Sequence, residues 1–177
     1  MSIREKLPCS VALALAVGLS SAIAAEGQKF GQPIGAEDAA GWDISIAPDG
    51  VGLPAGSGTP AQGAVVYAAK CAACHGQKGE GQPNDRLVGG QLIGDQPAVK
   101  TVGSYWPYAT TLFDYTRRAM PWQQPKSLSN DEVYAVSAYI LWLNGIIGEN
   151  DVMNATTLPK VAMPNRDGFI PLYPDKK

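Results

Sequence analysis

The stretch Cys71-Ala72-Ala73-Cys74-His75 decides how we interpret the rest of the chain. Two cysteines three residues apart, with a histidine directly after the second, are the attachment signature of a c-type haem. Positions i, i+3 and i+4 of a helical turn share one face, so Cys71, Cys74 and His75 can all reach one flat macrocycle. The thiols would form thioethers with the two vinyl groups, and the imidazole would bind the iron. The sequence therefore predicts one covalently attached haem c.

Two other interpretations of this cysteine pair fit the sequence less well. A structural zinc site needs four ligands of the Cys or His type, but His75 is the only histidine and the chain has 3 cysteines in all. A thioredoxin-like redox pair would lie beside a βαβ pattern, and none is visible around Cys71 and Cys74. The single histidine also limits the chain to one haem by this route.

Residues 1–25 have the layout of a secretory signal peptide. Arg4 and Lys6 supply positive charge, residues 11–19 are an apolar run, and residues 22–24 form a small-residue cleavage site. A membrane-spanning helix needs about 20 apolar residues, so this run is too short to be one. We therefore predict export to the bacterial periplasm, which is consistent with the cofactor because c-type cytochromes mature outside the cytoplasm.

The rest of the chain suits one domain with an extension at each end. Residues 26–58 are rich in Gly and Pro, and we interpret them as an N-terminal extended arm, either a flexible linker or a segment that wraps the domain. Residues 59–148 form the predicted helical domain, and the proline-rich residues 149–177 form an irregular C-terminal arm. The net charge of −2 disfavours nucleic acid as a partner.

Three helices are predicted in the domain from their start and stop signals. The first begins at Thr59-Pro60, with Thr as the N-cap, and continues to the haem motif. The second is capped by Thr110 or Thr111 and ends before Pro121, because the residue before a proline avoids helical geometry. The last begins at Ser129, which forms a capping box with Glu132, and Gly145 is its natural stop.

An electron-transfer haem with two axial ligands needs a second one besides His75. A methionine thioether is suited because it is neutral and soft, and ligation by methionine and histidine raises the reduction potential. Met120 and Met163 both lie in Ala-Met-Pro triplets. We favour Met120 because it lies on a proline-bounded loop between two predicted helices, whereas Met163 follows the last one. Met153 is interpreted as core filler.

The haem motif and its flanks resemble class I cytochromes c over residues 59–145. The matching features are the Gly63/Tyr67/Cys71 spacing, the Ala119-Met120-Pro121 triplet and Ala138-Tyr139-Ile140 in the last helix. The resemblance implies an all-α fold around one haem, with Gly63 and Tyr67 packed against the last helix near Val136 and Tyr139. Asp85 stands where the family commonly has a proline whose carbonyl accepts the histidine N–H. A backbone carbonyl is still available there.

A narrower resemblance covers nearly the whole mature chain, including both arms. These residues resemble the cytochrome subunit of bacterial sulfite and sulfane dehydrogenases. The matching segments are residues 100–110, Arg118-Ala119-Met120-Pro121, residues 144–147, residues 163–169, and Trp42-Asp43 with Gly52-Leu53-Pro54. Some relatives carry two haems, a pattern that the lone His75 does not allow here.

This resemblance implies an electron-transfer protein with no chemistry of its own. Its electron donor would be a molybdenum sulfite or sulfane dehydrogenase subunit, and its acceptor a downstream cytochrome or oxidase. Two alternatives remain at this point. One is a general soluble shuttle unrelated to sulfur oxidation, and the other is a gas-binding haem protein with an open distal site. Arg117 and Arg118 are candidate partners for the haem propionates, as are Tyr105 and Trp106.

Overall fold

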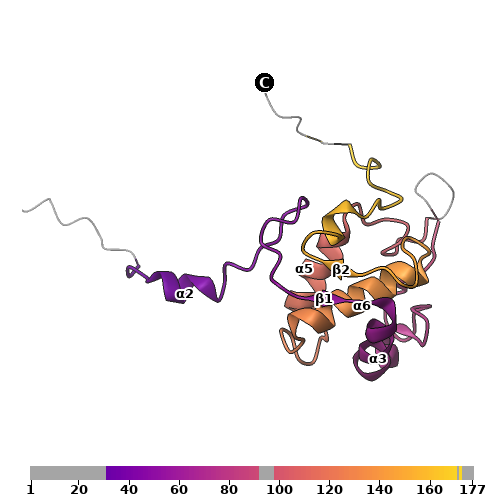
Figure 1. Ribbon diagram of the computed structural model, residues 1–177, viewed down its shortest axis with the longest axis horizontal. Coiled ribbons are helices and arrows are strands. Elements are labelled where there is room, and N and C mark those ends of the chain that lie inside the picture. The colour runs from indigo at the N-terminus through magenta and orange to yellow at the C-terminus, as the bar shows by residue number, and fades with distance from the viewer. Residues whose placement is uncertain (1–30, 92–97, 171, 173–177) are drawn as a thin grey trace, which may run out of the picture. The chain divides into compact units, whose positions relative to one another are not determined.

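The computed structural model describes residues 31–91, 98–170 and 172. The predicted signal peptide, residues 1–25, lies outside the described residues. The elements follow in the order α2 (Ala36–Ala40), β1 (Ser57–Gly58), α3 (Pro60–Lys70), α4 (Ala72–His75), α5 (Ala109–Ala119), α6 (Asn130–Leu143), β2 (Met153–Asn154) and the 3-10 helix η2 (Leu158–Lys160) (Figure 1). Within the described ranges, no helix is long and apolar enough to cross a membrane.

The chain divides into two compact units, Met1–Asp43 and Ile44–Lys177. In the first unit, α2 is a single short helix that begins after Gly35, whose N–H donates to Asp38 Oδ2 at 3.1 Å. None of the α2 residues is buried. The second unit contains all the other elements together with the haem motif, and everything below concerns that unit.

Helix α3 begins as its sequence predicts. The Thr59 hydroxyl accepts from Gln62 N at 3.3 Å, and Gln62 Oε1 accepts from Thr59 N at 2.9 Å, which forms a capping box with Pro60 in the first turn. Cys71 ends α3 and is at the same time the N-cap of α4. The haem motif therefore lies on a separate helical turn that directly continues α3.

Helix α5 ends where predicted but does not begin as predicted. Its last residue is Ala119, and Met120 before Pro121 has extended geometry, as a residue preceding proline should. The prediction that Thr110 or Thr111 caps this helix is wrong, because the N-cap is Tyr108 and makes no side-chain capping bond. Thr110 is buried inside the first turn instead, where its hydroxyl donates to Pro48 O at 3.3 Å.

Both ends of α6 confirm the sequence prediction. Ser129 Oγ accepts from Glu132 N at 3.3 Å, and Glu132 Oε2 accepts from Ser129 N at 2.8 Å. At the other end, Gly145 has a positive φ of 68°. Its N–H donates to Trp142 O at 2.8 Å, while Ile146 N donates to Leu141 O at 3.0 Å. This pair of bonds is the Schellman motif, in which glycine is favoured.

The core is built where α3 crosses α6. Tyr67 on α3 and Tyr139 on α6 pack with ring centroids 5.2 Å apart. Gly63 makes the close approach possible, because a Cβ atom there would lie 1.9 Å from Ala135 O and 2.7 Å from Tyr139 Cβ. The implied packing of Gly63 and Tyr67 on the last helix is therefore present. The residue that Gly63 meets is Ala135, one position before the expected Val136.

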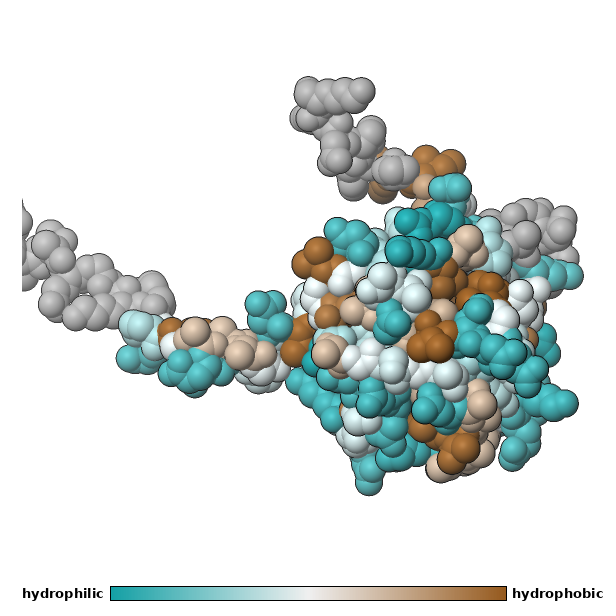
Figure 2. Space-filling view, viewed as in Figure 1, coloured by the Kyte–Doolittle hydropathy of each residue, from teal (hydrophilic) through white to brown (hydrophobic). Residues whose placement is uncertain are grey.

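The segments that flank the helices also pack on this unit. Tyr134 Oη donates to Pro54 O at 2.9 Å and Ser57 N donates to Asp131 Oδ1 at 2.7 Å. Strand β1 pairs antiparallel with β2, with Gly58 opposite Met153. The fold is thus mostly helical, as expected, with one small two-stranded sheet that the sequence did not reveal. On the face shown in Figure 2, hydrophobic residues form separate patches among hydrophilic ones.

Candidate haem-binding site

The residues of the haem motif line one cavity together with the loop after α5. Cys71, Cys74 and His75 contribute from α4 and the residue before it, and Met120 contributes from the end of α5. The apolar lining consists of Leu87, Val102, Trp106, Leu112, Pro121, Trp122, Val136 and Ile140. Of these, α6 provides Val136 and Ile140, which lie one helical turn apart. The cavity is therefore walled by elements that are far apart in the sequence.

The imidazole of His75 is held in one orientation. Its Nδ1 lies 2.8 Å from the backbone oxygen of Asp85. A carbonyl oxygen can only accept, so Nδ1 carries a proton, and in the neutral ring Nε2 is then the nitrogen that can bind a metal. Metal-binding histidines commonly use this arrangement, because the second hydrogen bond fixes the tautomer and the ring orientation. Asp85 thus supplies the carbonyl that the family commonly takes from a proline at this position.

The loop after His75 is tied back to the haem motif by its backbone. Gly81 N donates to His75 O at 2.8 Å, and Asn84 N donates to Cys74 O at 2.9 Å. Tyr67 Oη donates to Gly76 O at 3.0 Å. Burial raises the pKa of Tyr67 above its usual value, so the hydroxyl keeps the proton that it donates. These bonds fix where the loop leaves α4 and returns to it.

The two thiols of the motif are half-buried and face the same cavity. Burial raises the pKa of Cys71 to about 11, with a further contribution from the neighbouring Cys74. The Cys71 thiol is therefore neutral near pH 7. Because the two cysteines are three residues apart on the turn that carries His75, the sulfurs and the imidazole face one space.

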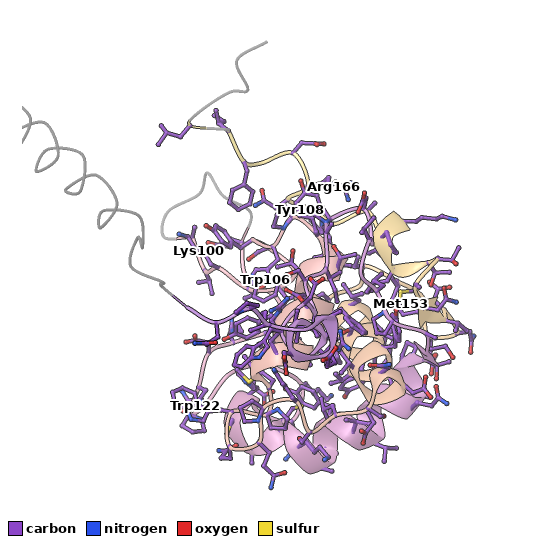
Figure 3. All side chains as sticks on the ribbon, turned by 90° about the vertical axis from the view of Figure 1, so that its left-hand side faces the viewer. Lys100, Trp106, Tyr108, Trp122, Met153 and Arg166 are labelled. Atoms are coloured by element: carbon purple, nitrogen blue, oxygen red, sulfur yellow. The ribbon has the colours of Figure 1, made fainter. Side chains whose placement is uncertain are left out.

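The three internal methionines lie in different surroundings. Met120 lines the cavity with His75, whereas Met153 and Met163 are buried in the core and do not belong to its lining. Figure 3 shows Met153 on the opposite side of the view from Trp122, which does line the cavity. The structure therefore brings Met120, and not the equivalent triplet at Met163, to the same cavity as the histidine.

Positive side chains line the cavity, but they are not the ones that the sequence indicated. Arg118 Nε bonds Asp114 Oδ1 at 2.8 Å along α5, and neither Arg117 nor Arg118 belongs to the lining. Lys70, Arg86 and Lys100 are lining residues instead. Of the two aromatic candidates for the propionates, Trp106 lines the cavity and Tyr105 does not. No motif marks these three cations, since each is a single charge in a different segment.

This donor set fits a haem c. An imidazole with a free Nε2, a thioether, two thiols one helical turn apart, an apolar wall and three cations all face one cavity. A bound haem would be held on its histidine side by the α4 turn and enclosed by the side chains of α5 and α6. Its two propionates would find positive partners among Lys70, Arg86 and Lys100.

Comparisons with known proteins agree with this geometry. Residues 58–140 match the family model described as cytochrome c oxidase, cbb3-type, subunit III. The structure also matches a chain from the crystal structure of the sulfane dehydrogenase SoxCD from Paracoccus pantotrophus, with 39% sequence identity and a TM-score of 0.76. The match covers 84% of this chain and 73% of that chain.

The chain therefore belongs to the cytochrome c family, whose members carry haem c and transfer electrons. Its family membership makes it an electron-transfer protein. Within the family, it is similar to the cytochrome subunit of SoxCD. This likeness agrees with the narrower resemblance found in the sequence, and it extends well beyond the helical domain matched by the family model.

Proposed function

We propose that this protein is a periplasmic monohaem cytochrome c that accepts single electrons from a molybdenum sulfite or sulfane dehydrogenase subunit. It would pass them to a downstream cytochrome or oxidase. The observation that carries the proposal is the 39% identity to the SoxCD chain over 84% of this chain. Identity at that level, extending beyond the helices into the flanking segments, supports a similar docking partner as well as a similar fold.

In this proposal, Cys71 and Cys74 hold the haem covalently, and His75 and Met120 are its axial ligands. The bound iron supplies one-electron redox chemistry. His75 contributes a fixed imidazole, since its Nδ1–H is bonded to Asp85 O. Met120 contributes a neutral sulfur, which favours the ferrous state. Because both axial positions would be taken by side chains, the iron would have no open position for a substrate.

The mouth of the cavity is the proposed docking surface for the electron donor. Trp122 is 75% exposed and Tyr115 is 47% exposed, and both line the cavity. Tyr115 packs edge-on against Trp106, with ring centroids 5.6 Å apart. Figure 3 shows Trp122 at the periphery of the molecule. An exposed aromatic rim beside the haem suits a small, transient contact, because redox encounters typically bury little surface.

The test is the rate at which the donor reduces the haem. Ferric protein is mixed with the molybdenum dehydrogenase from the same genome and its sulfur substrate, either sulfite or protein-bound sulfane sulfur. Haem reduction is followed by stopped-flow absorbance. We expect rapid reduction that needs both components. Trp122→Glu should slow it with an unchanged haem spectrum, whereas Val65→Glu, on a 72% exposed residue of α3, should not. Equal rates for the two variants would place the docking surface elsewhere.

A second candidate function is a shuttle that feeds a terminal oxidase without a sulfur-oxidising partner. It is favoured by the description of the family model, which is a subunit of cbb3-type cytochrome c oxidase. The same stopped-flow assay separates the two candidates. A sulfur-independent shuttle would be oxidised quickly by an oxidase, yet the dehydrogenase would not reduce it with either sulfite or protein-bound sulfane sulfur.

A further inference from the structure

The carbonyl that orients His75 lies in an exposed segment. Asp85 O accepts from His75 Nδ1 at 2.8 Å, but Asp85 and its neighbour Arg86 are both exposed. Burial therefore does not hold this carbonyl in place. Upstream, the segment is tied by Asn84 N, which donates to Cys74 O at 2.9 Å. Downstream, Arg86 Nε donates to Glu80 O at 3.1 Å, and Leu87 N and Val88 N both donate to Gly79 O, at 2.9 and 3.0 Å. These bonds tie the segment to the loop after His75 but not to the helices.

The anchor that joins this segment to a helix is the side chain of Asn144, the residue that ends α6. Asn144 Nδ2 donates to Leu87 O at 3.3 Å and to Ile140 O at 2.8 Å. Its Oδ1 accepts from Gly89 N at 2.9 Å. The two carbonyls can only accept and the backbone N–H can only donate, so these partners fix the orientation of the amide. One side chain thus joins α6 to the segment after Asp85.

The same segment is also bonded to Thr101, which lines the cavity. The Thr101 hydroxyl donates to Gly89 O, so Gly89 is bonded through both its N–H and its carbonyl. Thr101 N donates to Ser104 Oγ at 3.0 Å, and Ser104 Oγ donates to Val99 O at 2.8 Å. Thr101 is 2% exposed and lines the cavity. Asn144 therefore lies at the junction of the segment after His75 and the wall at Thr101.

Asn144 also lies close to Gly103 on its other side. A Cβ atom on Gly103 would lie 2.1 Å from Asn144 Oδ1. The amide is thus confined between Gly103 on one side and the 87–89 segment on the other. Without its side chain, Leu87 O and Gly89 N would each lose a partner, and the 87–89 segment would lose its hydrogen bonds to the end of α6.

We propose that Asn144 is a positioning residue for His75, acting through the 87–89 segment to hold the Asp85 carbonyl against Nδ1. The inference rests on the proposed function, in which His75 binds the iron. A hydrogen bond at Nδ1 raises the basicity of a metal-binding imidazole and fixes its ring. When Asn144 is removed, this bond weakens and His75 becomes a poorer electron donor. Ferric iron is then less stabilised, so the reduction potential rises.

The experiment measures exchange of the His75 Nδ1 proton in the reduced holoprotein by NMR. In Asn144→Ala, we expect this proton to exchange about tenfold faster than in the wild type, the factor that loss of local hydrogen bonding should produce. The reduction potential should rise in the same variant. The matched control is Asn165→Ala, because Asn165 Nδ2 also donates to a backbone carbonyl, Tyr105 O, at 2.7 Å. The control should leave the His75 proton unchanged.

A second variant keeps the test valid if Asn144→Ala loosens the whole fold. Asn144→Asp keeps the side-chain size and the acceptor for Gly89 N but loses both donors, so it should also speed the exchange. Wild-type exchange in both Asn144 variants would overturn the inference, as would equal acceleration in Asn165→Ala. A wild-type protein without a haem-shifted His75 ring signal would instead refute the proposed axial ligand.

Discussion

Replacing Gly63 by alanine tests how closely α3 and α6 cross. The added Cβ would lie 1.9 Å from Ala135 O, 2.5 Å from Ala135 C and 2.7 Å from Tyr139 Cβ. All three distances are far shorter than van der Waals contacts, and the two nearest atoms belong to the backbone of α6. A change of side-chain rotamer cannot relieve such a clash. The two helices must therefore move apart, and with them the wall that α6 contributes to the cavity.

The size of the effect follows from two opposing terms. Overpacking a core costs about 1–3 kcal/mol, and we expect the top of this range because backbone has to move. Alanine is favoured over glycine inside a helix by about 1 kcal/mol, which offsets part of this cost. The free energy of unfolding of Gly63→Ala should therefore fall by about 2 kcal/mol, which is about a 30-fold change in the folding equilibrium.

The assay is denaturant unfolding of the holoprotein followed by circular dichroism. Ala68→Gly, at an exposed position of the same helix, is the control for helix propensity and should cost about 1 kcal/mol. If α3 and α6 did not cross closely, only the propensity term would remain. Gly63→Ala would then be about 1 kcal/mol more stable than the wild type, and a measured gain of that kind would refute the described crossing.

The remaining predictions concern the haem and the core. Replacing both Cys71 and Cys74 with alanine should leave haem that acidified organic solvent extracts, because no thioether remains; haem that stays with the denatured double variant would end the c-type assignment. Met120→Ala should remove the near-infrared sulfur-to-iron band of the ferric protein and lower its reduction potential, whereas Met163→Ala should do neither. If Met163→Ala removes the band and Met120→Ala does not, Met163 is the axial ligand. Among the described residues, Ser137 Oγ is a buried hydroxyl without a hydrogen-bond partner. Ser137→Ala should therefore raise the free energy of unfolding by about 1 kcal/mol. A clear loss of stability in thermal or denaturant unfolding would contradict this prediction.

The parts of the fold that sequence predicts well are those fixed by near neighbours. The N-cap at Thr59, the capping box at Ser129 and the stop at Gly145 each involve residues within a few positions, and all three are present. The start of α5 was missed because a distant residue decides it. The Thr110 hydroxyl bonds Pro48 O, 62 positions away in the chain, and is therefore not the helix cap. No local pattern carries that information.

In the candidate site, too, the residues marked by local sequence signals were predicted and the others were not. The haem motif is a contiguous signal, and the structure places its three side chains on one cavity as the spacing requires. The choice of Met120 also relied on local context, namely the proline that follows and the helices on either side. The cations could not be chosen in this way. Arg118 forms an ion pair with Asp114, four positions away, whereas Arg86 and Lys100 reach the cavity only because of how their loops fold back.

The C-terminal segment shows why composition alone misleads about packing. Its prolines predict irregular structure, and apart from β2 and η2 the described part of residues 149–177 is irregular. Yet Met153, Leu158, Val161 and Met163 are all among the buried residues of the core. An irregular chain has no fixed period, so its inward-facing residues leave no repeating pattern in the sequence. Buried side chains such as these contribute about 2–5 kcal/mol each when deleted. Removing residues 149–177 should therefore expose the core, and a docking role for this segment has to be tested by surface substitutions such as Phe169→Glu, on a residue that is 47% exposed.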